Sequence, residues 1–411
     1  MDLILRNASL FEPGRTGRFD IGVQAGKIAA IEPQLAARAG EEHDAGGRLV
    51  VGGLVDSHIH LDKSHILDRC PPEEGRLTNS MPRVSAAKHS FTVEDVYARA
   101  KRSLESCILN GAMRMRTHVE LDPKVGLRSL EAIEQLARDY AWAIDLEICV
   151  FPQEGMTNNP GTEELMLAGL KRGAKVVGAA PNYDTNKPAQ VARVFEMGRE
   201  FGVDIDMHLD FGNAPTDMDI DQVCTLTEQY QYGGRVNVGH LTKISTAPVE
   251  QQQEVAGRMA DCGVVLTVLT ATDLYGMGRD QTYDIRRGVV DANAFDRLGV
   301  RCSLGTNNIM NPFTPMGDGD LIRMANLQAN TTQIGTASGL AKLFAMVSHD
   351  AARIMNLKDY GIAVGNPADL VVIDAASPAE AVAEIRPCLM GWKRGRKTFD
   401  RPAPALHRPV Q

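Results

Sequence analysis

Apolar and polar residues alternate in short runs over the first fifty positions, and turn-forming residues separate these runs. The runs at residues 3–6, 20–24 and 27–32 predict strands of a small sheet. A similar pattern returns near the other end, where residues 365–374 predict a strand entered through a turn and residues 388–397 predict a hairpin. Because both ends share this pattern, we expect them to form one sheet-rich unit into which the middle of the chain is inserted.

The middle of the chain repeats an apolar run followed by an amphipathic segment. The amphipathic segments at residues 93–110, 126–140 and 162–172 predict helices. Eight apolar runs predict strands, at residues 49–55, 113–119, 145–151, 175–179, 203–208, 235–240, 264–269 and 300–305. Eight strand–helix units predict an α/β fold, a distorted TIM-type (β/α)8 barrel rather than an open sheet.

These patterns divide the chain into a barrel and a smaller domain. Residues 1–52 and 362–411 are predicted to build the small, β-sandwich-like domain from both termini. Residues 53–361 are predicted to build the barrel.

Composition narrows the classes of function. The formal net charge of -8 argues against a nucleic-acid binder, whose surface is usually basic. No stretch is apolar over enough residues to span a membrane, and the first residues lack the pattern of a signal peptide. Seven widely spaced cysteines without a CxxC pair favour reduced thiols and a cytoplasmic location.

Histidines gather at the ends of the predicted strands. His58 and His60 follow the first strand one residue apart, so alternation places both side chains on the same side. His118, His208 and His240 end the second, fifth and sixth strands. Since the C-terminal ends of barrel strands form one rim, these five imidazoles predict a metal site there.

The same residues carry a family resemblance. The segment Gly53-Leu-Val-Asp-Ser-His58-Ile-His60 resembles the amidohydrolase signature. Further motifs resemble, in order, cytosine deaminase and its relatives of the N-isopropylammelide amidohydrolase type: Arg116-Thr-His118-Val, Phe151-Pro-Gln153-Glu154-Gly155, His208-Leu-Asp210, Gly239-His240, Asn311-Pro-Phe-Thr-Pro and Tyr360-Gly-Ile-Ala-Val-Gly-Asn-Pro-Ala-Asp369-Leu. The resemblance covers nearly the whole chain.

The resemblance implies one divalent metal ion, Zn or Fe, held by His58, His60 and His208. The fourth ligand position falls at Asn307. In such a site the metal lowers the pKa of a water, which His240 would hold or polarise.

A second metal is not expected. Two-metal relatives use a modified lysine at the end of the fourth strand, and residues 178–182 contain none. Lys63 lies in the first loop, where a solvated side chain is the common case, although it could reach the pocket.

The chain departs from the family pattern at two positions. Asn307 replaces the acidic ligand, and Phe211 occupies the position of the glutamate that shuttles protons. Asparagine has no charge and accepts no proton near neutral pH.

Three interpretations of these departures stay open. Other acids near strand ends could take over, namely Asp210, which we predict to be catalytic with His240, or Glu154, Glu120, Asp318 or Asp320. A different substrate could need less proton transfer, with Gln153, Phe211 and Phe313 contacting its ring. The site could also bind a ligand without turnover.

We therefore predict a metal-dependent hydrolase that cleaves a C–N bond of a nitrogen heterocycle by cytosine deaminase-like chemistry. The alternatives are a non-catalytic or weakly catalytic binding paralogue and a hydrolase of cyclic amides or N-substituted heterocycles. The expected partner is a small heterocyclic substrate, with neither nucleic acid nor membrane. A homo-oligomer is expected from the resemblance.

Overall fold

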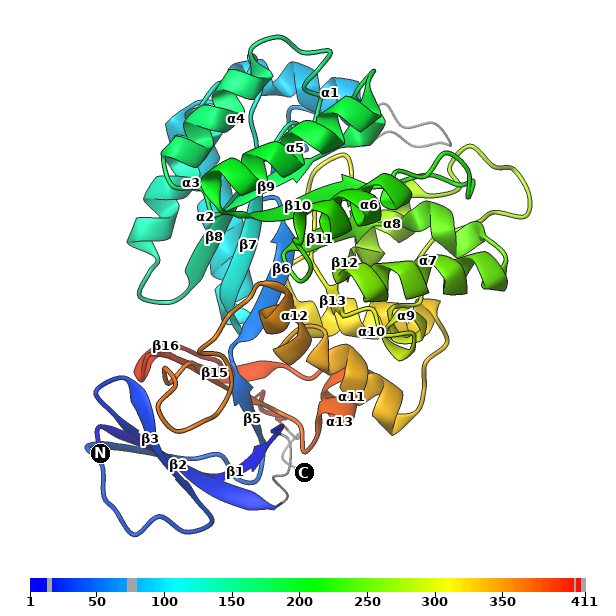
Figure 1. The fold of residues 1–411 in the computed structure, drawn as a ribbon. Coiled ribbons are helices and arrows are strands. Elements are labelled where there is room, and N and C mark those ends of the chain that lie inside the picture. Colours follow the sequence, from blue (N-terminus) through cyan, green and yellow to red (C-terminus); the bar gives the residue numbers. More distant parts are fainter. Residues whose placement is uncertain (13–16, 72–79, 403, 408–411) are drawn as a thin grey trace.

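The computed structural model contains two eight-stranded sheets. One forms a barrel, and the other lies below it in Figure 1. The structure describes residues 1–12, 17–71, 80–402 and 404–407. The barrel strands are all parallel and neighbour one another in chain order. They are β6 (Leu54–Ile59), β7 (Ala112–Glu120), β8 (Asp145–Phe151), β9 (Val176–Ala179), β10 (Asp204–Leu209), β11 (Val236–His240), β12 (Val264–Val268) and β13 (Cys302–Leu304).

The barrel closes between its first and last strands. A bridge pairs Ile59 with Asn307, which lies just beyond β13. The backbone N–H of Asn307 donates to the carbonyl of His58 at 2.8 Å, and the N–H of His60 donates to the carbonyl of Asn307 at 2.8 Å. The predicted α/β barrel is confirmed, and its closure lies beside the first histidines.

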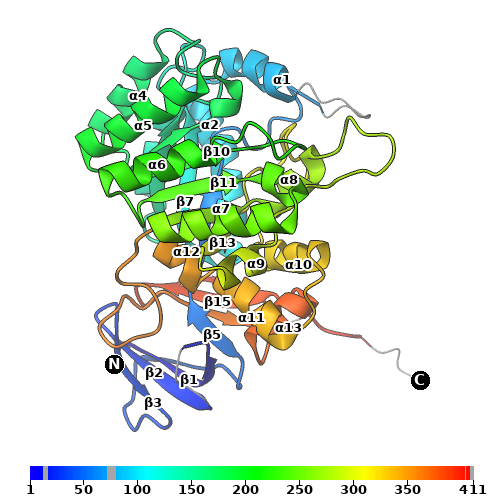
Figure 2. The same ribbon diagram turned by 45° about the vertical axis from the view of Figure 1, so that its right-hand side comes forward.

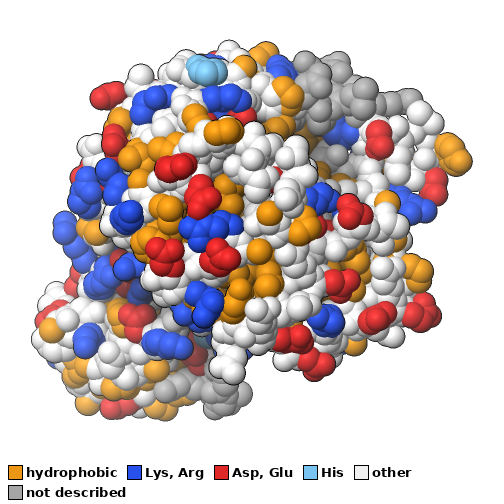
Figure 3. Space-filling view, turned by 45° about the horizontal axis from the view of Figure 1, so that its top comes forward, with side chains coloured by type: hydrophobic (Ala, Val, Ile, Leu, Met, Phe, Trp, Pro, Cys, Tyr) orange, Lys and Arg blue, Asp and Glu red, His pale blue; other side chains and the backbone are white. Residues whose placement is uncertain are grey.

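Helices cover the outside of the barrel (Figure 2). They are α1 (Ser80–Ala87), α2 (Val93–Leu109), α3 (Arg128–Asp139), α4 (Thr162–Lys171), α5 (Lys187–Phe201), α6 (Ile220–Tyr230), α7 (Val249–Cys262), α8 (Thr270–Gly276), α9 (Ala292–Arg297), α10 (Leu321–Thr331), α11 (Ala337–Ala345) and α12 (His349–Ile354). Within the described ranges, none of the helices has both the length and the apolar character needed to cross a membrane. On the face shown in Figure 3, acidic and basic side chains are interspersed.

Both termini contribute to the second sheet, as predicted. Its strands are β1 (Leu3–Leu10), β2 (Arg18–Gln24), β3 (Lys27–Glu32), β4 (Glu41–Asp44), β5 (Leu49–Gly52), β14 (Leu370–Ile373), β15 (Cys388–Lys393) and β16 (Arg396–Asp400), and α13 (Pro378–Glu384) connects β14 to β15. The two ends of the chain meet where β14 pairs antiparallel with β5, with Leu370 opposite Gly52. The sheet has an apolar core of its own, and Trp392 is fully buried in it. The exact boundaries of the two domains stay a prediction.

The apolar run at residues 49–55 is two strands, which corrects the expectation of one. β5 ends at Gly52 and pairs within the small sheet, whereas β6 begins at Leu54 and pairs with β7. A Cβ at Gly53 would lie 2.4 Å from Cβ of Met113. An unbroken apolar run shows that both parts are buried but not that they belong to different sheets. The small sheet therefore joins the barrel where β6 begins, at the end away from the histidines.

We predict that Gly53→Ala lowers the free energy of unfolding by about 1–3 kcal/mol, because the added methyl group overlaps Met113 close to the backbone. Urea denaturation followed by circular dichroism measures this change. Gly257→Ala is the matched control, since nothing lies within 4 Å of its added methyl group and it sits inside α7. The control should gain about 0.5–1 kcal/mol. Equal stability of Gly53→Ala and wild type would contradict the close fit between the two sheets.

Candidate functional site

Three imidazoles converge at the rim where the barrel strands end. His58 lies in β6, His60 follows it, and His208 lies in β10. The Nε2 atom of His208 is 3.1 Å from Nε2 of His58 and 2.9 Å from Nε2 of His60. Nitrogen ligands of a tetrahedral zinc ion at 2.0–2.1 Å would lie about 3.3 Å apart. The observed spacing is close to that of a shared metal ion.

The protonation state of these imidazoles also suits a cation. Burial lowers the pKa of His58 to about 3 and lowers the pKa of His60 and of His208 well below the ordinary value. The neighbouring imidazoles lower the pKa of all three further, as does Lys63 at His60 and His208, whereas Asp206 opposes the fall at His58. Neutral imidazoles keep a free lone pair, which is the form that binds a metal ion. The group could therefore hold a divalent cation without first losing protons.

A buried carboxylate lies close behind two of the rim imidazoles, inside the barrel. Oδ1 of Asp206 lies 3.7 Å from Nδ1 of His58 and 3.4 Å from Nε2 of His118. Arg116 donates to Oδ2 of Asp206 at 2.8 Å and to Glu147 at 2.6 Å. Burial raises the pKa of Asp206, but the histidines and Arg116 outweigh it, and the pKa lies well below its usual value. Carboxylates behind ligating histidines are a regular feature of metal sites.

His118 offers a competing set of ligands. Nitrogen atoms of His58, His118 and His208 lie within 4.8 Å of one another. However, the His118 ring stacks on His58 with centroids 3.8 Å apart, and its Nε2 faces Asp206. His60 and His208 line the cavity at the rim, and His118 does not. The geometry therefore favours the set that contains His60.

Most of the predicted site residues line this one cavity. They are His60, Gln153, His208, Phe211, His240, Asn307 and Phe313. His58 lies against His208 without lining the cavity. Segments far apart in the sequence thus meet at one rim, as expected for strand ends of a barrel.

Asn307 lies at the barrel closure and lines the cavity. Its φ of +60° is in the left-handed region, which asparagine adopts more easily than most residues. The side-chain oxygen and nitrogen are both buried, and neither has a hydrogen-bond partner among the described residues. A buried amide without partners fits a group that the cavity would bind.

Asp210 is not where a proton carrier is expected. It has a φ of +50°, and its carboxylate accepts the backbone N–H groups of Asp219 at 2.8 Å and Ile220 at 3.1 Å. It does not line the cavity. The left-handed backbone turns this side chain towards the start of α6, so the catalytic role predicted for Asp210 finds no support in its placement.

A carboxylate that the sequence did not suggest supports His240. Asp273 in α8 lies with Oδ1 2.5 Å from Nδ1 of His240 and is fully buried. Burial raises the pKa of Asp273, and His240 opposes that rise. With Nδ1 held by the carboxylate, Nε2 of His240 is the ring nitrogen available to the cavity.

Lys63 is buried at the cavity wall, which corrects the expectation of a solvated lysine. Its side chain is 2% exposed. The ammonium donates to Glu120 at 2.5 Å and to Oε1 of Gln153 at 3.0 Å, and it lies 4.9 Å from the centroid of the Phe313 ring. Because Oε1 of Gln153 accepts from Lys63, the amide nitrogen of Gln153 is left to donate to a ligand.

The other acids considered as substitutes are paired elsewhere. Lys88 binds Glu120 at 2.9 Å and Asp122 at 2.5 Å, and it also contacts Glu154. Burial lowers the pKa of Lys88, but these three carboxylates outweigh it and raise the pKa above its usual value. Asp320 accepts backbone N–H groups at the start of α10, and Asp318 pairs with Arg323. Of the described residues, those that line the histidine cavity include no carboxylate.

The chain is similar to known hydrolases over most of its length. Residues 141–399 match the model of the Amidohydrolase family. The chain is 28% identical over 405 residues to the N-isopropylammelide isopropyl amidohydrolase of Pseudomonas sp. (strain ADP), covering 96% of each protein. It is 24% identical over 391 residues to the pterin deaminase of Rhizobium rhizogenes (strain K84 / ATCC BAA-868), covering 94% of this chain and 88% of that protein.

A solved structure matches the fold closely. The crystal structure of 5-methylcytosine deaminase from Klebsiella pneumoniae, liganded with 5-fluorocytosine, superposes with a TM-score of 0.93 at 26% identity. The match covers 99% of both chains.

The ion cluster beneath the cavity yields a prediction. Lys88→Met should lower the free energy of unfolding by about 3–5 kcal/mol, because the buried carboxylates of Glu120 and Asp122 and the half-buried one of Glu154 would lose their shared cation. Urea denaturation measures the loss. Lys101→Met is the matched control, since its side chain is 46% exposed and its distance to Glu105 is 3.9 Å, and it should change stability by less than about 0.5 kcal/mol. A loss no larger than that of the control would show that Lys88 does not hold the cluster.

Proposed function

The chain belongs to the amidohydrolase family, and from this premise we propose that it is a metal-dependent hydrolase that cleaves a C–N bond of a nitrogen heterocycle. The convergence of the Nε2 atoms of His58, His60 and His208 carries the proposal. The named activities of the relatives, on N-isopropylammelide, pterin and 5-methylcytosine, support a heterocyclic substrate. The cysteines of the chain are all free and buried, which supports a reducing, cytoplasmic location.

We assign His58, His60 and His208 as ligands of one divalent ion, Zn or Fe, with the Asn307 amide oxygen as a neutral fourth donor. Bound there, the ion would act as a Lewis acid that makes a water nucleophilic near neutral pH. Asp206 lies next to Nδ1 of His58 and would fix the orientation of that imidazole.

The cavity wall would orient a flat polar ring. The Gln153 amide nitrogen and the Lys63 ammonium donate hydrogen bonds, so they suit a ring nitrogen or a carbonyl oxygen. Phe211 and Phe313 supply apolar surface against the ring. A positive charge at Lys63 would also stabilise negative charge that develops on the heterocycle.

Proton transfer would rest on His240. Among the residues that line the cavity, the titratable groups are imidazoles, the Lys63 ammonium and the Tyr183 phenol. Nε2 of His240 would accept a proton from the attacking water and return it to the leaving nitrogen, while Asp273 holds Nδ1. Asp273 is thus a positioning residue.

One observation favours a second function, that of a binding protein without turnover. The amide of Asn307 stands where the family resemblance places a carboxylate, and an uncharged ligand binds a cation less strongly. Such a protein would bind a heterocycle in the same cavity and release no product.

A product-release screen separates the two functions. We expect the purified protein to hold about one Zn or Fe per chain and to release ammonia or amine from at least one of cytosine, 5-methylcytosine, pterin and N-isopropylammelide. Metal content is measured by inductively coupled plasma mass spectrometry. Asn307→Asp should raise metal affinity, because a carboxylate adds charge to the site.

Two histidine variants control this screen. His208→Ala should lose both metal and turnover with its circular dichroism spectrum unchanged, whereas His89→Ala, an exposed histidine outside the site, should keep both. A metal-free wild type that gains turnover only with Asn307→Asp would contradict the enzyme and favour the binding protein.

Asp273→Asn tests the proton path. The amide cannot hold His240 in the same tautomer, so we expect kcat to fall by about 100-fold or more while metal content stays the same. The matched control is Asp261→Asn, an exposed position in α7 that should keep the wild-type kcat. A wild-type kcat and pH profile in Asp273→Asn would remove Asp273 and His240 from proton transfer.

A further inference from the structure

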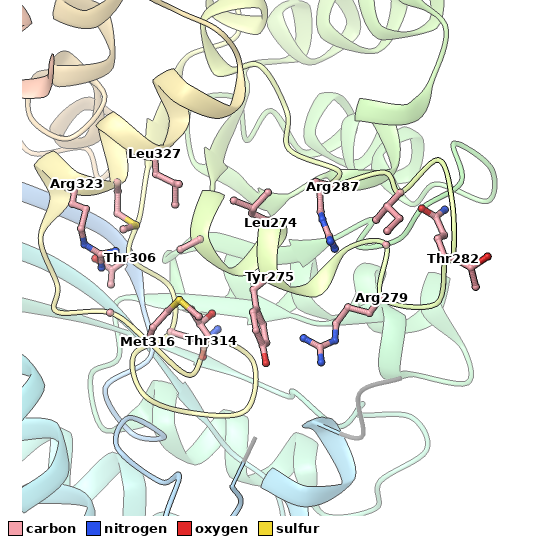
Figure 4. Close-up of a pocket in the computed structure, with 17 residues that line it drawn as sticks. Leu274, Tyr275, Arg279, Thr282, Arg287, Thr306, Thr314, Met316, Arg323 and Leu327 are labelled. Carbon is pink, nitrogen blue, oxygen red and sulfur yellow. The ribbon is translucent and has the colours of Figure 1, made fainter. Parts of the chain in front are cut away.

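A second and larger cavity lies beside the histidine cavity, with a volume of about 580 Å³ (Figure 4). Helices α8 and α10, together with the segments at residues 277–287 and 314–317, form its walls. Thr306 and Asn308, which follow the last barrel strand, also line it. The cavity therefore lies at the rim that carries the histidines. We call it the arm pocket.

The lining of the arm pocket combines apolar and cationic side chains. Its apolar surface includes Leu274, Met324 and Leu327. Figure 4 shows Leu274 and Leu327 on the walls of this space. Its charged residues are Arg279, Arg287 and Arg323, and none of the described lining residues is acidic. An apolar body that carries an anionic group matches this surface.

Arg287 provides the charge available to such an anion. Its Nη1 donates to the backbone carbonyl of Met277 at 3.0 Å, which fixes the guanidinium at the pocket. Among the described residues, no carboxylate lies within ion-pair distance of Arg287, whereas Arg323 is paired with Asp318 at 2.9 Å. A guanidinium forms two parallel hydrogen bonds to a carboxylate.

The wall between the two cavities is thin. Asn308 lines both of them. Thr272 lines the histidine cavity and Thr314 lines the arm pocket, and their hydroxyl oxygens are 2.7 Å apart. A ligand bound at the histidines would therefore be separated from the arm pocket only by side chains such as that of Asn308.

We propose that the arm pocket binds a carboxylated apolar arm of the substrate, whose heterocyclic ring occupies the histidine cavity. The substrate class is thus a nitrogen heterocycle with a flexible, acid-terminated substituent. This inference rests on the proposed function for the ring, but the pocket itself can be tested without turnover.

The binding test uses 3-phenylpropionate, with 3-phenylpropan-1-ol as its uncharged counterpart, in isothermal titration calorimetry on the metal-loaded protein. We expect the acid to bind more tightly than the alcohol. Arg287→Met should weaken binding of the acid by about fivefold or more and leave binding of the alcohol unchanged. The matched control Arg297→Met, whose side chain is 68% exposed in α9, should bind both like wild type.

The kinetic test compares N-(3-carboxypropyl)ammelide with N-propylammelide. We expect the ratio of their kcat/KM values to favour the acid and to fall by about fivefold or more in Arg287→Met. If neither these compounds nor any heterocycle of the product-release screen is turned over, but 3-phenylpropionate binding depends on Arg287, the proposed hydrolysis fails while the arm pocket is still shown to bind an anion. If turnover occurs and the ratio is unchanged in Arg287→Met, the inference about the arm is overturned, whatever 3-phenylpropionate does.

Discussion

The convergence of three neutral imidazoles, two buried and one half-buried, is the interaction on which the site depends. His58 and His60 come from the first barrel strand and His208 from the fifth, so their nitrogens meet only because the barrel closes. The closure is made by backbone hydrogen bonds of Asn307 to the two histidines of the first strand. The residue that we propose as the fourth ligand therefore also fixes the backbone of the first two proposed ligands.

The charges around this centre set the chemistry that it can perform. The carboxylates near the cavity lie behind cations or histidines: Asp206 behind His58 and His118, Asp273 behind His240, and Glu120 behind Lys63. The cavity wall itself then presents neutral donors and one ammonium. Such a wall would favour a ring that accepts hydrogen bonds and would leave proton transfer to His240.

The strand–helix repeat and the spacing of the histidines were enough to predict the barrel and the rim at which its site lies. Strict alternation could also have revealed Asp206 and Arg116, because each lies two residues before a rim histidine on the same strand. Other features depend on contacts across the fold. The carboxylate that pairs with His240 belongs to α8. Lys63 is buried because residues from neighbouring strand ends pack around it. The chain breaks at Gly53 because β5 pairs within a second sheet. The direction of the Asp210 side chain could not be predicted, because the local sequence pattern does not show a left-handed backbone.

Anomalous diffraction from crystals of the metal-loaded protein, recorded at the absorption edge of the bound metal, tests the central assignment most directly. One peak per chain is expected at about 2.0–2.1 Å from Nε2 of each of His58, His60 and His208, with the side chain of Asn307 beside it. A peak coordinated by His118 in place of His60, or no peak at all in fully loaded protein, would contradict the assignment.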